Sequence, residues 1–435
     1  MTVRGEETRI YLRLQMHHRT VAGNGLRVIT NHMPDTRAVC IAVFVSTGSR
    51  YEREDEAGCS HFIEHLCFKG TQRRPTAKEI AETIDGVGGL LNGGTDKEFT
   101  IYWCKVARPH FVSALDLLAD MIRCSKFDNQ DVERERQVIN EELNESMDSP
   151  QDRVNRLIDE VVWPGQPLGR EIIGNRETIN SIRRDVLLDY MNCQYGPGNT
   201  VVSVAGAIDH EEVLSDIDKV FGDWGVTVPR SSESADDSQE EIRLQIERRD
   251  TEQAHLCLAV RGLPFAHPDR FNLDLLNIIL GSGMSSRLNL EIRERRGLAY
   301  DIHSYAEYFL DSGAVIINAG VDPRNVADTL KAVVDELIRI KEEIPAVEIA
   351  KAKEMVKGRL LLSMEDTRSV AGWVGGQEIL IGKVRPVEEV LSIVDAITAQ
   401  DLKRVAEHIL VTEKLNLAVV GPVGDEGNLR DLLKI

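Results

Sequence analysis

Two histidines and a glutamate stand close together in the pentapeptide His61-Phe62-Ile63-Glu64-His65. On a helix, His61 and His65 lie one turn apart on the same face, so their imidazoles can share one metal ion. Zinc suits such nitrogen ligands. Glu64 lies beside the pair and can take a proton from water without binding the metal itself. The order H-x-x-E-H is the inverse of the better known metal-binding order H-E-x-x-H.

The surroundings of this triplet favour a functional role over two surface histidines that happen to neighbour an acid. Apart from the triplet and Ser60, the segment Cys59–Leu66 is apolar. Polar side chains on an otherwise buried helix are costly unless they have partners. A metal ion shared by the histidines would provide such a partner.

A catalytic zinc site needs a third protein ligand and one open position. A second acidic helix is expected over Asp131–Glu145, where Glu135 and Glu142 are seven residues apart and share one stripe. Glu141 and Glu145 compete for the same role, and a solvated charged helix would show the same pattern. The residue types alone therefore leave the third ligand open.

The elements that must position these side chains occur twice along the chain. The apolar run Val39–Val43 is similar to Leu256–Val260, and both are typical of buried strands. Each half also ends on an Asn-led apolar strand that closes with glycine, at Asn199–Gly206 and Asn416–Gly421. A period of about half the chain indicates a duplicated domain rather than a solenoid.

Each half combines strands with long amphipathic helices. The strand Phe99–Trp103 precedes a helix at Phe111–Ile122, and the strand Ala314–Asn318 precedes a helix at Val326–Ile338. This mixture predicts an α+β fold of two homologous domains, each a mostly antiparallel β-sheet flanked by α-helices.

The segment Val226–Glu241 is polar and acidic and contains Pro229 and a serine cluster, which is typical of a linker. We therefore expect an N-terminal domain with the metal-binding residues at 1–228, a linker at 229–241 and a C-terminal homologous domain at 242–435.

The amino-acid composition excludes several classes of function. A chain of 435 residues, 42% of them hydrophobic, is long enough for two globular domains. The net charge of −19 argues against a nucleic-acid surface, and no apolar run is long enough for a membrane helix. The acidic start of the chain has the pattern of neither a secretion signal nor an organelle presequence. Seven cysteines without a CxxC motif fit reduced thiols in the cytoplasm.

The sequence resembles the inverted zinc metallopeptidases of the pitrilysin and mitochondrial-processing-peptidase family, and within it the two-domain bacterial type. The resemblance covers nearly the whole chain. It rests on the motif from Gly58 to Thr71, the run from Glu133 to Glu142, and the segment Asp85–Asn92 between them.

The resemblance implies roles for particular residues. His61 and His65 match the two histidine ligands of one zinc ion per chain, and Glu142 matches the third ligand. Glu64 matches the general base. Glu135 matches an auxiliary glutamate that orients a ligand or tunes the bound water.

The second half has no H-x-x-E-H motif, and there the resemblance rests on Arg293 and Tyr300. These match an Arg/Tyr pair that contacts substrate and supports the tetrahedral intermediate. In the family, an edge strand that here reads Asn92-Gly93-Gly94-Thr95 pairs with the extended substrate. Gly93 and Gly94 depart from the usual pattern. We expect two glycines to loosen this strand and to empty a side-chain position.

The implied function is a zinc-dependent endopeptidase that cleaves short or unfolded peptides, in processing or in oligopeptide degradation, by Glu-assisted attack of a zinc-bound water. The alternative is a non-catalytic or substrate-holding subunit of a heterodimeric processing peptidase. The resemblance implies a homodimer, with a heterodimer as the other assembly. The cysteines predict a cytoplasmic location, and the net charge and the lack of a long apolar run predict neither nucleic acid nor a membrane as a partner.

Overall fold

The computed structural model describes residues 17–424 and 426–435, and the N-terminal residues with the acidic start lie outside this part. The chain forms two compact units, and neither is continuous in sequence. Unit 1 consists of the described residues up to Leu143 together with Glu171–Glu233 and Arg359–Val390. Unit 2 consists of Asn144–Arg170, Ser234–Gly358 and Leu391–Ile435.

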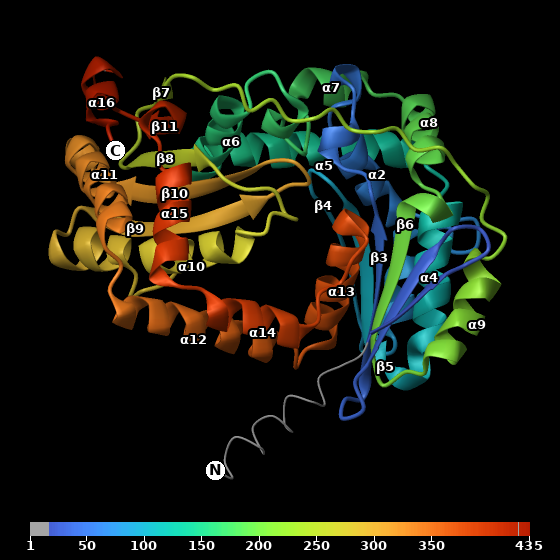
Figure 1. Cartoon of the computed structure of the whole chain (residues 1–435). Coiled ribbons are helices and arrows are strands. Elements are labelled where there is room, and N and C mark those ends of the chain that lie inside the picture. The colour runs from blue at the N-terminus through green and yellow to red at the C-terminus, as the bar shows by residue number, and fades with distance from the viewer. Residues whose placement is uncertain (1–16, 425) are drawn as a thin grey trace, which may run out of the picture. The chain divides into compact units, whose positions relative to one another are not determined.

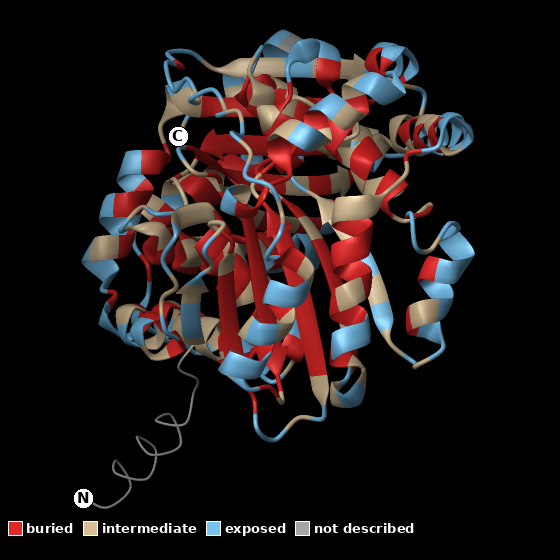
Figure 2. Ribbon diagram, turned by 90° about the vertical axis from the view of Figure 1, so that its right-hand side faces the viewer, coloured by how far each residue is buried: buried red, intermediate tan, exposed pale blue. Residues whose placement is uncertain are grey.

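Unit 1 is built on a six-stranded sheet whose central strands are rich in β-branched residues. The strand order is β1 (His17–Val21), β2 (Arg27–His32), β6 (Thr200–Gly206), β3 (Ala38–Val45), β5 (Thr100–Ala107) and β4 (Leu90–Thr95). Only β2 and β6 run parallel. Strands β3 and β6 are buried almost throughout (Figure 2), because helices cover both faces of the sheet.

The helices of unit 1 fall on the two faces of this sheet (Figure 1). One face carries α4 (Phe111–Cys124) and α9 (His210–Phe221), with α2 (Cys59–Cys67) near β4. The other face is covered by α13 (Thr367–Ile381), where Ser203 of β6 donates a 2.8 Å hydrogen bond to the Ala371 carbonyl. Four further helices complete the unit or begin in it: α3 (Ala77–Asp85), α5 (Asn129–Asp148), α7 (Arg176–Ser181) and α8 (Arg184–Gln194).

Unit 2 repeats this plan on a five-stranded sheet. Its strand order is β7 (Arg243–Arg248), β11 (Leu415–Gly421), β8 (Ala254–Arg261), β10 (Gly313–Val321) and β9 (Ala299–Tyr308), with β7 and β11 parallel. Its helices include α6 (Pro150–Val162), α10 (Arg270–Leu280), α11 (Val326–Glu342) and α15 (Ala399–Ile409). The remaining helices are α12 (Ala346–Ser363), α14 (Val387–Ala396) and α16 (Glu426–Leu432). The predicted pair of homologous α+β domains is thus confirmed.

The units differ from the expected domains by an exchange of helices. Helix α6 precedes the expected linker, yet it packs on β8 and β11 of unit 2, where its apolar residues Val154, Leu157 and Ile158 are buried. Helix α13 follows the linker, yet it packs on β3 and β6 of unit 1. Each helix buries its apolar stripe against the sheet of the other half. A boundary drawn along the sequence cannot represent this exchange.

None of the helices in the described part of the chain combines the length and the apolar character needed to cross a bilayer.

Candidate active site

Helix α2 carries the H-x-x-E-H motif, and its first turn is set by Gly58 and Glu52. Gly58 has φ 98° and no capping side chain, and a Cβ there would lie 2.6 Å from Ile179 Cδ1. The buried Glu52 carboxylate accepts hydrogen bonds from the backbone N–H groups of Gly58 (2.8 Å) and Ser60 (2.7 Å). Glu52 therefore caps the helix from outside it. We did not predict this role, because no spacing rule marks an acid seven residues before a helix.

The same helix divides its faces between core and site. Cys59, Phe62, Ile63 and Leu66 are buried, whereas the three motif side chains are only partly covered. The imidazole rings of His61 and His65 have centroids 4.6 Å apart. The helix therefore presents both rings to one space, as the sequence predicts.

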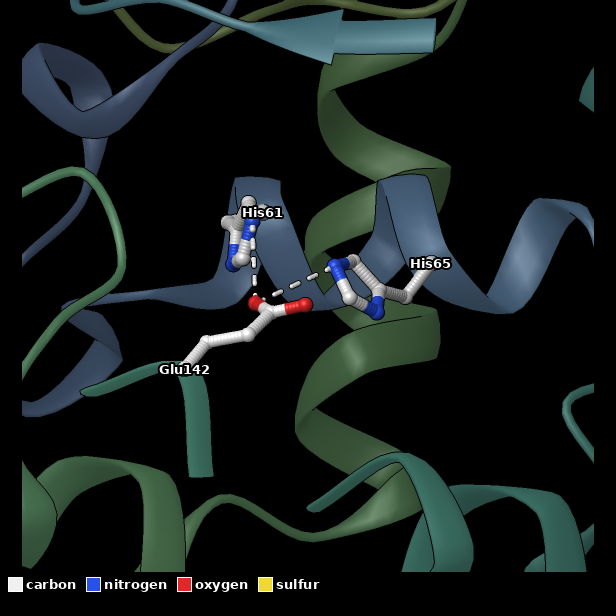
Figure 3. A group of neighbouring side chains, drawn as sticks. All are labelled: His61, His65 and Glu142. Carbon is white, nitrogen blue, oxygen red and sulfur yellow. Dashed lines mark ion pairs between the residues drawn. The ribbon is translucent and has the colours of Figure 1, made fainter. Parts of the chain in front are cut away.

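Helix α5 brings Glu142 to these rings (Figure 3). Glu142 Oε2 lies 3.6 Å from His65 Nε2 and 3.9 Å from His61 Nε2. One ligand atom from each residue lies within 4.8 Å of the others, and among the described residues no other group of this kind occurs. Glu141 and Glu145, which competed for this role, are exposed and outside the group.

The donor set fits a zinc ion. Two imidazole nitrogens and one carboxylate oxygen are the protein ligands of many catalytic zinc sites. Burial and the neighbouring His65 lower the pKa of His61 to about 4, so its ring is neutral at pH 7 and keeps a lone pair for a metal. The Nδ1 atom of His61 is buried and has no hydrogen-bond partner among the described residues.

Glu135 and Lys69 hold the second histidine. His65 Nδ1 donates to Glu135 Oε2 at 3.2 Å, and Lys69 Nζ lies 2.9 Å from Glu135 Oε1. Burial alone would raise the pKa of Glu135, but the hydrogen bonds from His65 and Lys69 outweigh it and lower that pKa. Burial likewise acts to lower the pKa of His65, and Glu135 with the nearby carboxylates raises it overall. Lys69 was missed as a site residue, although it stands four residues after His65 in the same motif.

Glu64 faces the strand β4. Thr95 Oγ1 donates a 2.8 Å hydrogen bond to Glu64 Oε2. Burial raises the pKa of Glu64, with Thr95 and His65 opposing this shift. The pKa of Glu64 is thus closer to neutral pH than that of a solvated glutamate, which suits a general base.

Strand β4 lies at the edge of its sheet and pairs only with β5 among the described strands. Its ladder runs without a bulge from Leu90 to Thr95, through both Gly93 and Gly94. The expected loosening of the strand therefore does not appear in its pairing register. Asn92 is exposed, and its side chain accepts from the backbone N–H of Gly93 at 2.8 Å.

Arg293 and Tyr300 belong to unit 2, apart from the unit that holds the histidines. Arg293 lies in a π-helical segment (Asn289–Arg295), and Tyr300 follows at the start of β9 with 78% of its surface exposed. Glu291 binds the neighbouring Arg295 and Arg296, each at 2.8 Å.

Arg293, by contrast, has only Glu294 at 3.9 Å as its ion-pair partner among the described residues. Of Arg293, Arg295 and Arg296, Arg293 is therefore the one without a close ion pair among the described residues.

Two segments of the sequence match known protein families, and these matches identify the family of the chain. Residues 27–176 match the family described as insulinase, peptidase family M16, and residues 181–356 match the peptidase M16 inactive domain. The chain belongs to this peptidase family. The family assignment of the first segment includes the H-x-x-E-H motif and Glu142, and that of the second segment includes Arg293 and Tyr300.

Relatives within the M16 family extend over nearly the whole chain. An uncharacterised zinc protease of Bacillus subtilis is 36% identical over 94% of this chain and 99% of its own length. One of Mycobacterium leprae is 36% identical over 96% of this chain and 94% of its own length. Among solved structures, a protease from Helicobacter pylori has a TM-score of 0.90 at 24% identity, covering 94% of this chain and 100% of the other. The similarity to the Helicobacter pylori structure shows that the two proteins share the same fold.

Proposed function

We propose that the protein is a zinc-dependent endopeptidase that cleaves short or unfolded peptides, in processing or in oligopeptide degradation. The observation that carries this proposal is the convergence of His61, His65 and Glu142 with the Glu64 carboxylate beside them. A metal-storage site would not need a partly buried carboxylate that stands next to the ligands without being one. The names of the zinc protease relatives support the same reading.

His61, His65 and Glu142 would hold the ion, which when bound activates water and polarises a carbonyl oxygen. Glu64 takes the proton of the attacking water on its carboxylate and later delivers a proton to the leaving amine nitrogen. The exposed edge of β4 binds the peptide in extended form by main-chain pairing, with Asn92 beside it. Arg293 and Tyr300 donate hydrogen bonds to the oxygen on which negative charge develops.

The decisive experiment compares zinc-loaded protein with its Glu64→Gln variant on a quenched basic peptide. We expect hydrolysis by the first, none by the second, and zinc bound to both. Glu142→Gln should lose zinc, whereas Glu141→Gln, an exposed neighbour on the same helix, should keep it. Wild-type protein that binds zinc and forms its assembly but cleaves nothing would favour the substrate-holding subunit instead. A wild-type protein that binds no zinc would refute the metal site.

The assembly that we propose is a cytoplasmic homodimer, in which Arg293 and Tyr300 of one subunit act at the zinc site of the other. Seven cysteines without a disulfide support a reducing location. A mixture of the Arg293→Ala/Tyr300→Phe variant with the Glu64→Gln variant tests the exchange between subunits. Activity should return on mixing, because one hybrid site then has a complete set of residues. Lack of recovery in proven mixed dimers would exclude action across the interface.

A further inference from the structure

Strand β4 touches the Glu64 side chain at two positions that lie two residues apart. At Gly93, a Cβ atom would stand 3.1 Å from Glu64 Oε1, 3.2 Å from Glu64 Cγ and 3.0 Å from Phe68 Cε2. At Thr95, the hydroxyl donates to Glu64 Oε2 at 2.8 Å. Among the described residues, Thr95 is the one hydrogen-bond donor to the Glu64 carboxylate. The bare backbone of Gly93 and the Thr95 hydroxyl thus form a slot for the carboxylate.

Gly94 does not share this constraint. A Cβ there would have only Ile101 Cγ2 nearby, at an ordinary 3.8 Å. Successive residues of a strand face opposite sides, so Gly93 and Thr95 face α2 while Gly94 faces away. The two glycines that depart from the family pattern are therefore not equivalent. Of the two, Gly93 is the position where a side chain would press on Glu64 and Phe68.

We propose that Gly93 and Thr95 are positioning residues that fix the Glu64 carboxylate for proton transfer. This rests on the proposed peptidase function. The Thr95 hydrogen bond commits Oε2 and sets the rotation of the carboxylate, which leaves Oε1 available for the proton of water. The absence of a side chain at 93 lets the carboxylate lie against the strand. The same edge strand would bind the peptide backbone, so substrate and base are aligned by one element.

Kinetics separates this role from substrate binding. Thr95→Val keeps the shape of the side chain but removes the donor. A hydrogen bond to a charged group is strong enough for its loss to lower kcat by roughly 10-fold or more. We expect KM for the quenched basic peptide to stay near the wild-type value. Thr95→Ser keeps the hydroxyl and should restore most of kcat. A loss that appears in KM alone, or a Thr95→Val enzyme with wild-type kcat, would overturn the proposal.

The two glycines provide a matched pair. Gly93→Ala should lower kcat, because the methyl group pushes Glu64 and Phe68 away from the strand. Gly94→Ala adds the same methyl group on the opposite side, and any effect of it should appear in KM. Equal losses of kcat in both variants would show that strand flexibility, rather than the slot, is what matters.

Two readouts do not depend on turnover. Zinc affinity, measured by chelator competition, should be unchanged in Thr95→Val and Gly93→Ala, since both residues act on Glu64, which is not one of the proposed ligands. A crystal structure of zinc-free Thr95→Val should show Glu64 displaced from Gly93, and that of Thr95→Ser should show it in place. An unmoved Glu64 in Thr95→Val would refute the slot. If wild-type protein cleaves no peptide, the proposed function fails, while this structural comparison still decides the inference.

Discussion

Lys69 and Glu135 form an ion pair, with Nζ 2.9 Å from Oε1, directly behind His65. The other oxygen of Glu135 accepts from His65 Nδ1, so Lys69, Glu135 and His65 form one chain of contacts. Glu135 has a side chain only 2% exposed, and its charge would be costly there without partners. Lys69 therefore stabilises the carboxylate that orients His65.

Replacing Lys69 should weaken zinc binding without touching a ligand. We expect Lys69→Met to lower zinc affinity by up to roughly 10-fold, because Lys69 supports Glu135, and loss of a direct partner of a metal ligand costs about 10–100-fold. Lys69→Arg, which keeps the charge, should lose less. Chelator competition measures the affinity. Lys126→Met, which breaks an ion pair with Asp128 elsewhere, should leave zinc affinity unchanged. Wild-type affinity in Lys69→Met would show that Glu135 holds His65 without help.

Removing the Glu52 carboxylate should loosen the start of helix α2. In Glu52→Ala, the N–H groups of Gly58 and Ser60 lose their acceptor inside the protein. An unsatisfied buried group costs about 1–3 kcal/mol, so the free energy of unfolding of the zinc-free protein should fall by at least that range. Denaturant unfolding measures it.

The control for Glu52 lies in the same loop. Glu54 is exposed, and Glu54→Gln should change the free energy of unfolding by less than about 0.5 kcal/mol. Similar losses in both variants would mean that the net charge of the loop, rather than the helix cap, is responsible.

Sequence reasoning succeeded where the chemistry is local. The period of a single helix places His61, Glu64 and His65 on one side of it. The two similar apolar runs, one in each half of the chain, form strands β3 and β8. The choice of Glu142 over Glu141 and Glu145 came from family resemblance. Helix periodicity could not make it, because it does not say how α5 is rotated against α2.

The rest depends on contacts between segments distant in sequence. The exchange of α6 and α13 between units leaves no trace in composition, since each helix has the same apolar stripe in either place. Gly93 looks like a flexible position in sequence, whereas the structure shows it packed against Glu64. Such close approaches follow from tertiary packing, which no single-segment pattern encodes.

Acid should destabilise the zinc-free protein partly through His61. Its pKa is about 4 in the folded protein, below the value of about 6.5 in an unfolded chain. The unfolded state then binds a proton more readily, so stability is present above about pH 6.5 and is lost as the pH falls towards 4. The shift corresponds to roughly 3 kcal/mol. The pKa of His65 is raised in the folded protein, so the folded state binds this proton more readily than the unfolded state. Its contribution therefore lies at higher pH than that of His61, and there it adds stability as the pH falls.

His61→Gln should therefore flatten the fall in melting temperature of zinc-free protein between about pH 6.5 and pH 4. Replacing the exposed His408 by Gln should leave that slope as in the wild type. An unchanged slope in His61→Gln would show that the ring is solvated when the metal is absent.

Arg293 and Arg295 stand two residues apart, yet their substitution should have different effects on catalysis. Arg295 pairs with Glu291 at 2.8 Å, whereas the only acid near the guanidinium of Arg293 among the described residues is Glu294, at 3.9 Å. If Arg293 stabilises the developing oxyanion, Arg293→Ala should lower kcat by about 100-fold, as loss of an oxyanion donor does. Arg295→Ala should change kcat less than about threefold, because a surface ion pair contributes little. Initial-rate kinetics on the same quenched peptide gives both numbers. Equal losses would mean that the positive charge of the segment, rather than one guanidinium, supports the reaction.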